Sequence, residues 1–340
     1  MKCLDQEIQN DYAIYNMDCV DLAKSLPDGC IDYTIYSPPF ESMYVFSNSL
    51  RDMGNSTKEQ FHEHFHYLAD EMWRITRPGR LMSFHCMNLP TSKTNDGYIG
   101  IRDFRGQLIE MFCGGEAKKL HDAKVVFERL GRDTSEIDDA IQNASLLGGK
   151  WIYHSEVCIW KNPVVAMQRT KALGLLHKTI RKDSSMSRQG IADYLVTMRK
   201  PGENDKPIQH YRDIKEANEF DGDESRILPV ELWQKYASPV WMDIDQSRTL
   251  NFRDGRDPDD IKHICPLQLD VIERAIHLWS APGDLVFSPF MGIGSEGYQA
   301  VSMGRKFIGS ELKKSYFDLA VKNMRDSKKQ NMDLFSELEM

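Results

Sequence analysis

The sequence predicts an open α/β sheet in which short strands alternate with helices that cover the sheet. Apolar runs alternate with segments of helical periodicity over most of the 340 residues, and this alternation is typical of parallel strands joined by crossover helices. Two loops also follow directly on predicted strands, Ser37-Pro38-Pro39-Phe40 and, far along the chain, residues 290–294. Ligands of open α/β sheets bind at the carboxyl ends of the strands, so we expect both loops at one functional edge.

The predicted elements follow from apolar periodicity and from Pro and Gly turns. The first half contains strand 12–15, helix 19–26, strand 31–36, helix 57–76, strand 81–84 and strand 151–160. An Arg-Pro-Gly-Arg turn at residues 77–80 separates the long helix from the strand that follows it. The last third contains helix 266–279, strand 285–287, helix 295–303, strand 306–309 and helix 313–325.

Two stretches interrupt this pattern. Residues 114–149 lie between Gly-Gly pairs and carry two charged helical patterns, so we interpret them as a helical insertion at the periphery, with a structural role or a role in assembly or DNA contact. Residues 161–206 hold ten basic side chains against four acidic ones. We expect this run beside the predicted catalytic edge, where it is either a solvated face or a surface that contacts phosphates.

Composition restricts the class of protein. The chain is 41% hydrophobic and 28% charged, as in ordinary globular enzymes, and no apolar run approaches the roughly 18 residues of a membrane helix. The N-terminus lacks a signal-peptide core. Seven cysteines without CxxC spacing indicate free thiols in a reducing cytoplasm and no metal site. The net charge of −8 does not itself indicate nucleic-acid binding, so local charge matters more.

The loop at residues 290–294 has the features of a cofactor site. Gly292 and Gly294 allow the backbone to approach a ligand at a helix N-terminus. Glu311 ends the next strand, where a carboxylate is placed to accept hydrogen bonds from ribose hydroxyls. Gly297 completes the spacing of a dinucleotide fingerprint, so this loop alone leaves NAD open as the cofactor.

The same loop resembles a cofactor loop of a known family. Phe290-Met291-Gly292-Ile293-Gly294, after Pro282-Gly283-Asp284, is similar to the S-adenosylmethionine loop of DNA amino-methyltransferases, in which Asp-Pro-Phe usually stands where this chain has Ser288-Pro289-Phe290. The segment 263–266 resembles the part that holds the methionine moiety, with Cys265 in the place of a lysine. The cofactor residues that the resemblance implies are Asp18, His263, Cys265, Pro266, Ser288, Phe290, Gly292, Gly294, Ser295 and Glu311.

The loop Ser37-Pro38-Pro39-Phe40 resembles the catalytic tetrapeptide of that family, which begins with Asp, Asn or Ser and ends with an aromatic residue. By this resemblance, the Ser37 side chain and the Pro38 carbonyl accept hydrogen bonds from an exocyclic amino group and direct its lone pair to the methyl group. Pro39 stiffens the loop, and Phe40 stacks on the base. Catalysis is then positioning for an in-line transfer to a base flipped out of the duplex.

The order of the two loops implies a domain organisation. The catalytic loop precedes the cofactor loop, with a basic region between them, and this is the permuted order of the β class, whose members are often homodimers. We expect a Rossmann-like methyltransferase domain from residues 1–113, 150–163 and 262–327, the insertion 114–149, a target-recognition region 164–261 and a C-terminal tail 328–340. The residues expected to contact double-stranded DNA are Arg169, Lys171, Lys178, Arg181, Lys182 and Arg188.

Ser37 slightly favours cytosine N4 over adenine N6 as the target, because Asp at this position is more typical of adenine enzymes. The alternatives are adenine N6 methylation, an RNA amino-methyltransferase, and an NAD-dependent oxidoreductase. The last gives no reason for the Ser37–Phe40 loop.

Overall fold

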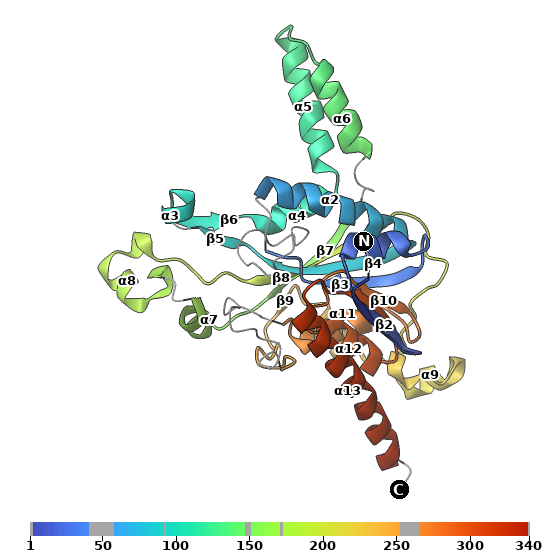
Figure 1. Ribbon diagram of the computed structural model, residues 1–340. Coiled ribbons are helices and arrows are strands. Elements are labelled where there is room, and N and C mark those ends of the chain that lie inside the picture. The colour runs from blue at the N-terminus through green and yellow to red at the C-terminus, as the bar shows by residue number, and fades with distance from the viewer. Residues whose placement is uncertain are drawn as a thin grey trace.

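A computed structural model describes residues 3–40, 58–91, 93–146, 151–170, 173–251 and 266–338. Its centre is a twisted sheet (Figure 1). Within the described residues, the strand order is β1 (Asp5–Ile8), β2 (Tyr12–Asn16), β11 (Lys306–Ser310), β10 (Leu285–Ser288), β3 (Ile31–Tyr36), β4 (Thr76–Met87), β8 (Asp193–Arg199), β7 (Ile152–Ile159) and β9 (Val240–Trp241). The α/β fold that the sequence predicts is therefore confirmed.

The sheet is parallel in its centre and has antiparallel pairs at both sides, with β1 antiparallel to β2 at one edge. Strands β2, β11, β10, β3 and β4 pair in parallel, whereas β8 pairs antiparallel with both β4 and β7. β7 therefore runs in the same direction as the central strands, as predicted for residues 151–160, and β8 is the strand that runs the opposite way. The segment from β7 to β8 holds α7 (Pro163–Thr170) and α8 (His177–Lys182), and α8 buries no residue. Because this connection does not cover the sheet as a crossover helix would, the chain returns antiparallel.

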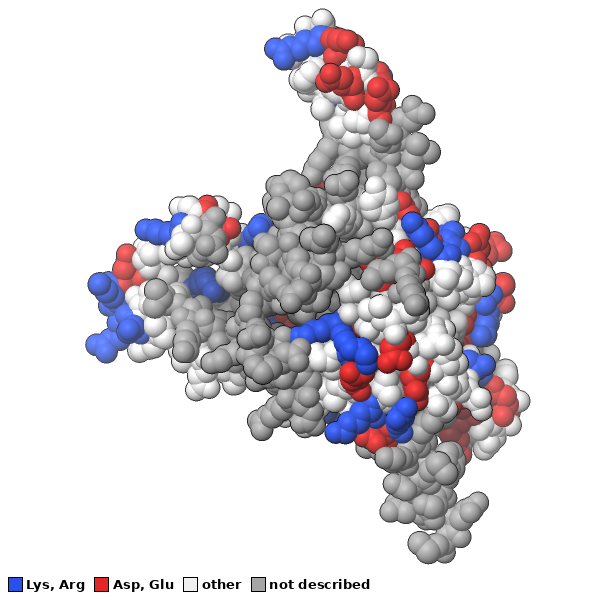
Figure 2. Space-filling view, viewed as in Figure 1, with Lys and Arg blue, Asp and Glu red and all other residues white. Residues whose placement is uncertain are grey.

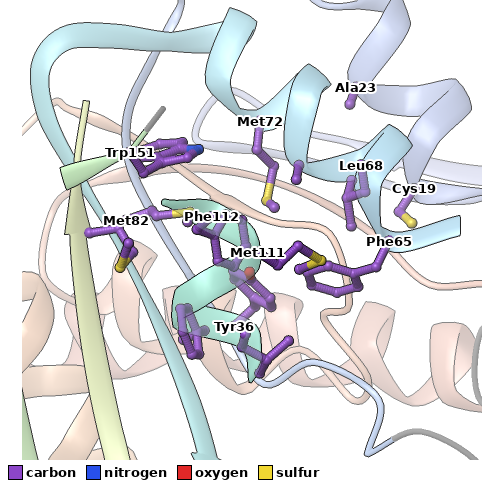
Figure 3. Packing of buried hydrophobic residues seen from close by; sticks show 14 of the residues in the cluster. Cys19, Ala23, Tyr36, Phe65, Leu68, Met72, Met82, Met111, Phe112 and Trp151 are labelled. Carbon is purple, nitrogen blue, oxygen red and sulfur yellow. The ribbon is translucent and has the colours of Figure 1, made fainter. Parts of the chain in front are cut away.

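Helices cover both faces of the sheet. On one face lie α1 (Cys19–Ser25), α2 (Lys58–Ile75) and α4 (Phe104–Phe112). The apolar positions predicted for α2, Phe61, Phe65, Leu68 and Met72, are all fully buried, and they pack with aromatic and sulfur side chains of the sheet and α4 (Figure 3). On the other face, α11 (Leu269–Trp279), α12 (Ser295–Ser302) and α13 (Lys314–Leu338) enclose a second apolar core.

Several elements lie outside these layers. Helices α5 (Gly115–Arg129) and α6 (Ser135–Leu146) occupy the stretch expected to be a helical insertion and project from the body as a pair (Figure 1). Helix α13 continues to Leu338, so the helix end predicted at residue 325 was wrong. The smaller elements are β5 (Leu89–Thr91), β6 (Gly100–Arg102), α3 (Lys93–Asp96), α9 (Ile214–Phe220), α10 (Val230–Tyr236) and the 3-10 turns Leu173–Leu175, Ser184–Met186 and Glu224–Arg226.

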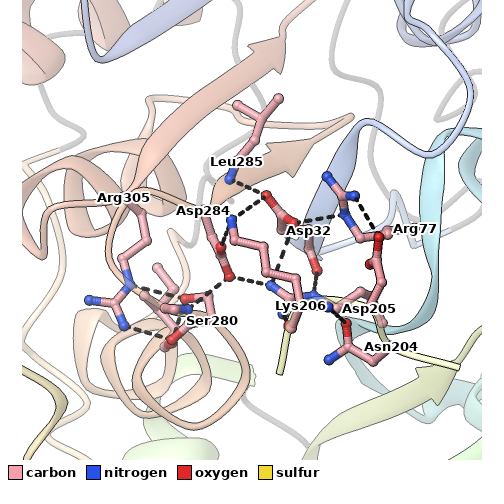
Figure 4. A network of polar contacts seen from close by, with 12 residues as sticks. Asp32, Arg77, Asn204, Asp205, Lys206, Ser280, Asp284, Leu285 and Arg305 are labelled. Carbon is pink, nitrogen blue, oxygen red and sulfur yellow. Dashed lines mark hydrogen bonds and ion pairs between the residues drawn. The ribbon is translucent and has the colours of Figure 1, made fainter. Parts of the chain in front are cut away.

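A buried polar network joins the strands at the edge opposite the two loops (Figure 4). The Arg80 side chain is 1% exposed, pairs with Asp284, and donates through Nε to the Asp32 carbonyl at 2.8 Å. Lys206 Nζ reaches the same Asp284 at 2.6 Å. Arg80 belongs to the predicted turn 77–80, which instead lies within β4. The network fixes β3, β4 and β10 relative to one another, and so fixes the loops at their other ends.

Among the residues that the structure describes, every helix is too short or too polar to cross a lipid bilayer.

Candidate active site

The two loops singled out in the sequence leave neighbouring strands. β3 pairs in parallel with β10, with Val286 opposite Tyr33, so Ser37 and the segment after Ser288 emerge at the same edge of the sheet. Pro38 and Pro39 are buried, whereas Ser37 and Phe40 are partly exposed. The Phe40 ring lies edge-on to Phe104 of α4, with 6.1 Å between the centroids. The loop thus packs against α4, and the side chains of Ser37 and Phe40 stay partly accessible.

Ser37 also contacts a residue that sequence reasoning missed. β3 and β4 pair with Tyr36 opposite Phe84, so the next residues, Ser37 and His85, are neighbours as well. Ser37 Oγ lies 3.2 Å from Nδ1 of His85. The only local signal for His85 is its position directly after the predicted strand 81–84, at the same sheet edge as Ser37.

His85 is backed by a buried carboxylate. Its Nε2 lies 3.2 Å from Oδ2 of Asp193, whose side chain is 5% exposed; the ring nitrogen lacks a well-aligned hydrogen bond, so this is a close charge–dipole contact. Lys161 Nζ lies 2.5 Å from the same oxygen. Burial raises the pKa of Asp193, but His85 and Lys161 lower it more strongly, and the net pKa lies below its usual value. Asp193 is therefore a carboxylate near neutral pH.

The glycine loop after β10 is tied to Glu311. The Gly292 N–H donates to Glu311 Oε2 at 3.0 Å, and the Lys313 N–H donates to Oε1 at 2.8 Å. Gly292 has a φ of 52° and Gly294 a φ of 87°, values that favour glycine. A Cβ at Gly292 would meet no atom within 4 Å, so the backbone here faces open space in which a ligand fits.

The third glycine of the loop has a packing role. A Cβ at Gly297 would lie 2.6 Å from the Phe307 ring and 2.8 Å from Met324 Sδ. Gly297 therefore allows α12 to approach β11 closely. The dinucleotide-like spacing thus includes one glycine that serves helix–sheet contact and carries no information on the cofactor.

The other predicted cofactor residues differ in their surroundings. Ser288 Oγ is buried and has no hydrogen-bond partner within the described ranges, and a buried hydroxyl in this state fits a polar ligand group. Asp18 and Phe290 contact protein: Asp18 caps α1 by accepting from the Val20 N–H at 2.9 Å, and the Phe290 ring stacks on Phe65. Ser295 is buried in the first turn of α12, and Pro266 is partly buried before α11. His263 and Cys265 lie outside the described residues.

A large cavity lies beside the candidate active site, and residues of the basic region 161–206 form much of its wall. Its volume is about 1010 Å³, and Lys93, Lys161, Lys178, Lys182 and Arg188 are among its lining residues. Lys178, Lys182 and Arg188 were predicted to contact DNA. Arg181 lies on α8 with Lys178 and Lys182, the Arg169 side chain is not described, and Lys171 lies outside the described residues. Figure 2 shows Lys and Arg side chains gathered over the α8 segment.

The basic run 161–206 is nevertheless not one surface. Lys200 is 7% exposed and donates to the carbonyls of Trp73 and Thr76, each at 2.7 Å. Lys206 belongs to the network with Asp284. Because β8 runs antiparallel to β4, residues after its end lie at the edge away from Ser37. The sequence-based assumption that the whole run lies beside the catalytic edge was therefore wrong.

The similarity of the chain to known proteins covers both loops and the region between them. A family model described as DNA methylase matches residues 31–322. The chain belongs to the DNA methylase family. The resemblance inferred from the two loops is thereby confirmed.

Individual relatives of this DNA methylase are distant or match locally. Type II methyltransferase M.BglII of Bacillus subtilis is 22% identical over 309 residues, which is 90% of the chain and 67% of the relative. Orphan methyltransferase M.BamHII of Bacillus amyloliquefaciens is 44% identical over 54 residues, 16% of the chain and 20% of the relative. In such local matches the chain spans well under two thirds of the relative's length.

Solved structures share the fold of this DNA methylase. TTHA0409 of Thermus thermophilus, solved in complex with S-adenosyl-L-methionine, aligns with a TM-score of 0.55 and 18% identity over 91% of each chain. The cytosine-N4-specific PvuII DNA methyltransferase aligns with a TM-score of 0.56 and 14% identity, over 95% of this chain and 90% of that chain. At such low identity these likenesses show the fold alone.

Proposed function

We propose that this DNA methylase transfers a methyl group from S-adenosyl-L-methionine to an exocyclic amino group of a flipped base in duplex DNA, and that the base is cytosine rather than adenine. The observation that carries the proposal is the adjacency of β3 and β10, which brings the Ser37–Phe40 loop and the glycine loop to one edge. The Ser37–Phe40 loop offers acceptors for an amino group, and the glycine loop offers open backbone for a nucleoside cofactor.

Several residues would hold the cofactor. Glu311 would accept hydrogen bonds from the ribose hydroxyls, the open backbone at Gly292 would lie against the ligand, and the unpaired Ser288 hydroxyl would bond one of its polar groups. S-adenosylmethionine supplies an electrophilic methyl group bonded to a sulfonium sulfur. The packing of Gly297 on Phe307 would serve a dinucleotide loop equally well. The dinucleotide alternative loses support instead because the DNA methylase family model matches residues 31–322.

The Ser37–Phe40 loop would orient the amino group. The lone pair of an exocyclic amine is delocalised into the ring, so the nitrogen is a poor nucleophile. When Ser37 Oγ and the Pro38 carbonyl accept its two N–H bonds, the nitrogen becomes more pyramidal and its lone pair points at the methyl group. The buried prolines hold that carbonyl in place, and the partly exposed Phe40 ring would stack on the base. Ser37 favours cytosine N4 only because Asp is more typical of the adenine enzymes of this family at that position.

The decisive experiment is sequencing-based mapping of modified bases in DNA from cells that express the protein. We expect N4-methylcytosine at one sequence motif, and its absence in cells that express Ser37→Ala. N6-methyladenine would instead support the alternative base, and methylation by Ser37→Ala at the wild-type level would overturn the catalytic assignment. Methyl incorporation into structured RNA but not into duplex DNA would identify an RNA enzyme.

The DNA would bind along the cavity lined by α8. Lys178, Lys182 and Arg188 are exposed or partly exposed there, and each phosphate contact adds roughly one unit to the slope of log affinity against log salt. We expect the Lys178→Gln/Lys182→Gln double variant to lower that slope by about two in a fluorescence-anisotropy titration. Lys215→Gln, on the exposed face of α9, is the matched control. An unchanged slope in the double variant would place the DNA elsewhere.

The homodimer expected from the β-class order remains a proposal. Light scattering of the purified protein over a range of concentrations tests it, and a constant monomer mass would contradict it.

A further inference from the structure

Four polar side chains form a chain of contacts that begins at Ser37 and leads away from the base. Ser37 Oγ lies 3.2 Å from His85 Nδ1, His85 Nε2 lies 3.2 Å from Asp193 Oδ2, and Lys161 Nζ lies 2.5 Å from the same carboxylate oxygen. They come from the loop after β3, from β4, from the start of β8 and from the segment after β7. The pairing of these strands places all four at one sheet edge.

The contact with His85 solves a problem that a serine poses at this position. A carboxylate has no proton and accepts a hydrogen bond in any orientation, whereas a hydroxyl carries one proton as well as two lone pairs. Ser37 presents a lone pair to an amino group reliably only when its own O–H is donated to another acceptor. Within the described residues, His85 Nδ1 is the acceptor that lies in reach of Ser37 Oγ.

The surroundings of His85 favour the tautomer that this requires. Asp193 is a buried carboxylate beside Nε2, so the ring proton is stabilised on Nε2 and the lone pair is left on Nδ1. The charged and titratable groups that the described contacts bring to the ring are Ser37 from the loop after β3, Asp193 from β8 and, through Asp193, Lys161 from the segment after β7.

We propose that His85 is a positioning residue for Ser37 and that it takes up, through Ser37, the proton equivalent that the methylated amino group releases. The inference rests on the proposed function. An amino nitrogen that gains a methyl group must lose one proton. That proton passes from nitrogen to Ser37 Oγ while the Ser37 proton passes to His85 Nδ1, so one N–H bond breaks, one N–H bond forms, and Ser37 ends neutral. The positive charge moves to the imidazole ring.

Asp193 and Lys161 make this acceptance reversible. The carboxylate stabilises the imidazolium, but Lys161 shares the same oxygen and repels it, so the ring does not hold the proton permanently. Lys161 is 27% exposed and lines the basic cavity, which places solvent close to this end of the contact chain. The ring can therefore return to its neutral form before the next turnover.

The test compares variants that separate the two roles of His85. His85→Asn keeps an acceptor near the position of Nδ1 but takes up no proton, whereas His85→Leu removes both. Single-turnover methylation of duplex DNA that carries the mapped motif should fall about 10²- to 10³-fold for His85→Leu and less for His85→Asn. The wild-type rate should decline on the acid side of its pH profile, and that decline should be absent in His85→Asn.

A second comparison uses a Ser37→Asp background, in which no histidine is needed to accept a hydroxyl proton. In a Ser37→Asp background the acceptor is a carboxylate, so adding His85→Leu should change the rate by less than about threefold, compared with the large loss expected in the Ser37 background. His154→Leu is the matched control, because His154 Nδ1 also contacts a serine, Ser155 Oγ at 3.0 Å, on the exposed part of β7. Its methylation rate should equal that of the wild type.

A measurement on the wild-type protein alone avoids any problem of misfolded variants. In ¹⁵N NMR spectra of histidine-labelled protein, His85 should show a protonated Nε2 and an unprotonated Nδ1 near neutral pH. A proton on Nδ1, or a His85→Leu rate within threefold of the wild type while Ser37→Ala is inactive, overturns the role of His85 and leaves the proposed function intact. Full activity of Ser37→Ala overturns the proposed function itself.

Discussion

Replacing Glu311 by Gln should weaken cofactor binding more than it weakens the fold. Both carboxylate oxygens already accept backbone hydrogen bonds, from Gly292 at 3.0 Å and Lys313 at 2.8 Å. The amide of Gln offers one oxygen and one NH₂ group, so one backbone N–H would face another donor. Loss of the charge-assisted bond to a ribose hydroxyl costs about 1.5–3 kcal/mol, which raises the Kd for S-adenosylmethionine by about 10- to 150-fold.

The cost to the free protein is separate and measurable. One unsatisfied backbone N–H costs about 1–3 kcal/mol, and an unfolding entropy of about 0.7 kcal/mol/K for a chain of this length converts this to a Tm lowered by about 1.5–4 °C. Isothermal titration calorimetry measures the Kd, and calorimetric unfolding measures the Tm. Asp318→Asn removes a carboxylate from the exposed side of nearby α13 and should change neither. Glu311→Gln binding within threefold of wild-type affinity would refute the reasoning.

Three further substitutions test the scaffold. Arg80→Met takes the buried guanidinium from Asp284 and leaves Lys206 as its cation, which should cost at most about 3–5 kcal/mol and lower the Tm by at most about 4–7 °C. Burial, followed by the nearby charges of His210 and Arg305, lowers the pKa of His277 from 6.5 to about 4. Because the folded state resists protonation, the free energy of unfolding should fall as the pH drops from about 6.5 to about 4. His277→Phe should flatten this part of the curve of unfolding free energy against pH. Gly297→Ala forces a methyl group against the Phe307 ring and should destabilise by about 1–3 kcal/mol, as seen in urea unfolding.

Each of the three has a control or an outcome that contradicts it. Arg199→Met is the control for Arg80→Met, because Arg199 contacts backbone carbonyls at 3.4 Å. An equal loss of Tm in the two variants would show that the buried polar network does not stabilise the fold more than an ordinary arginine contact does. A pH dependence that persists in His277→Phe would assign it to other groups. Gly190→Ala, at a site with open space around it, should be neutral, and equal stability of Gly297→Ala would show that α12 can move away from β11.

The parts of the site predictable from sequence are those that follow immediately on a strand. Ser37 and Gly292 could be placed at one edge because each comes after a short apolar run, and parallel strands end on the same side. The partners of Ser37 needed more information. His85 and Asp193 meet only because β8 runs antiparallel to β4, with Met87 opposite Asp193, and nothing in the apolar pattern of β8 reports its direction.

Charge was the least predictable property. Lys178 and Lys200 are both lysines of one basic run, yet the first lines an open cavity and the second is buried against the carbonyls of Trp73 and Thr76. The difference depends on whether the residue precedes β8 in the chain, as Lys178 does, or follows it, as Lys200 does. A count of charges along the chain cannot distinguish a lysine that lines a cavity from one that is buried against the carbonyls at the end of α2.

The ion pair between Lys161 and Asp193 joins the two ends of the segment 162–192, because Lys161 follows β7 and Asp193 begins the neighbouring strand β8. A segment fixed in this way can change in length and composition at little cost, since the entropy of closing a loop grows only slowly with its length. Under the proposed function, in which this segment contacts DNA, mutations within it would alter DNA recognition without moving Ser37 or His85. The ion pair thus lets the segment proposed to contact DNA change independently of the residues proposed to position the amino group.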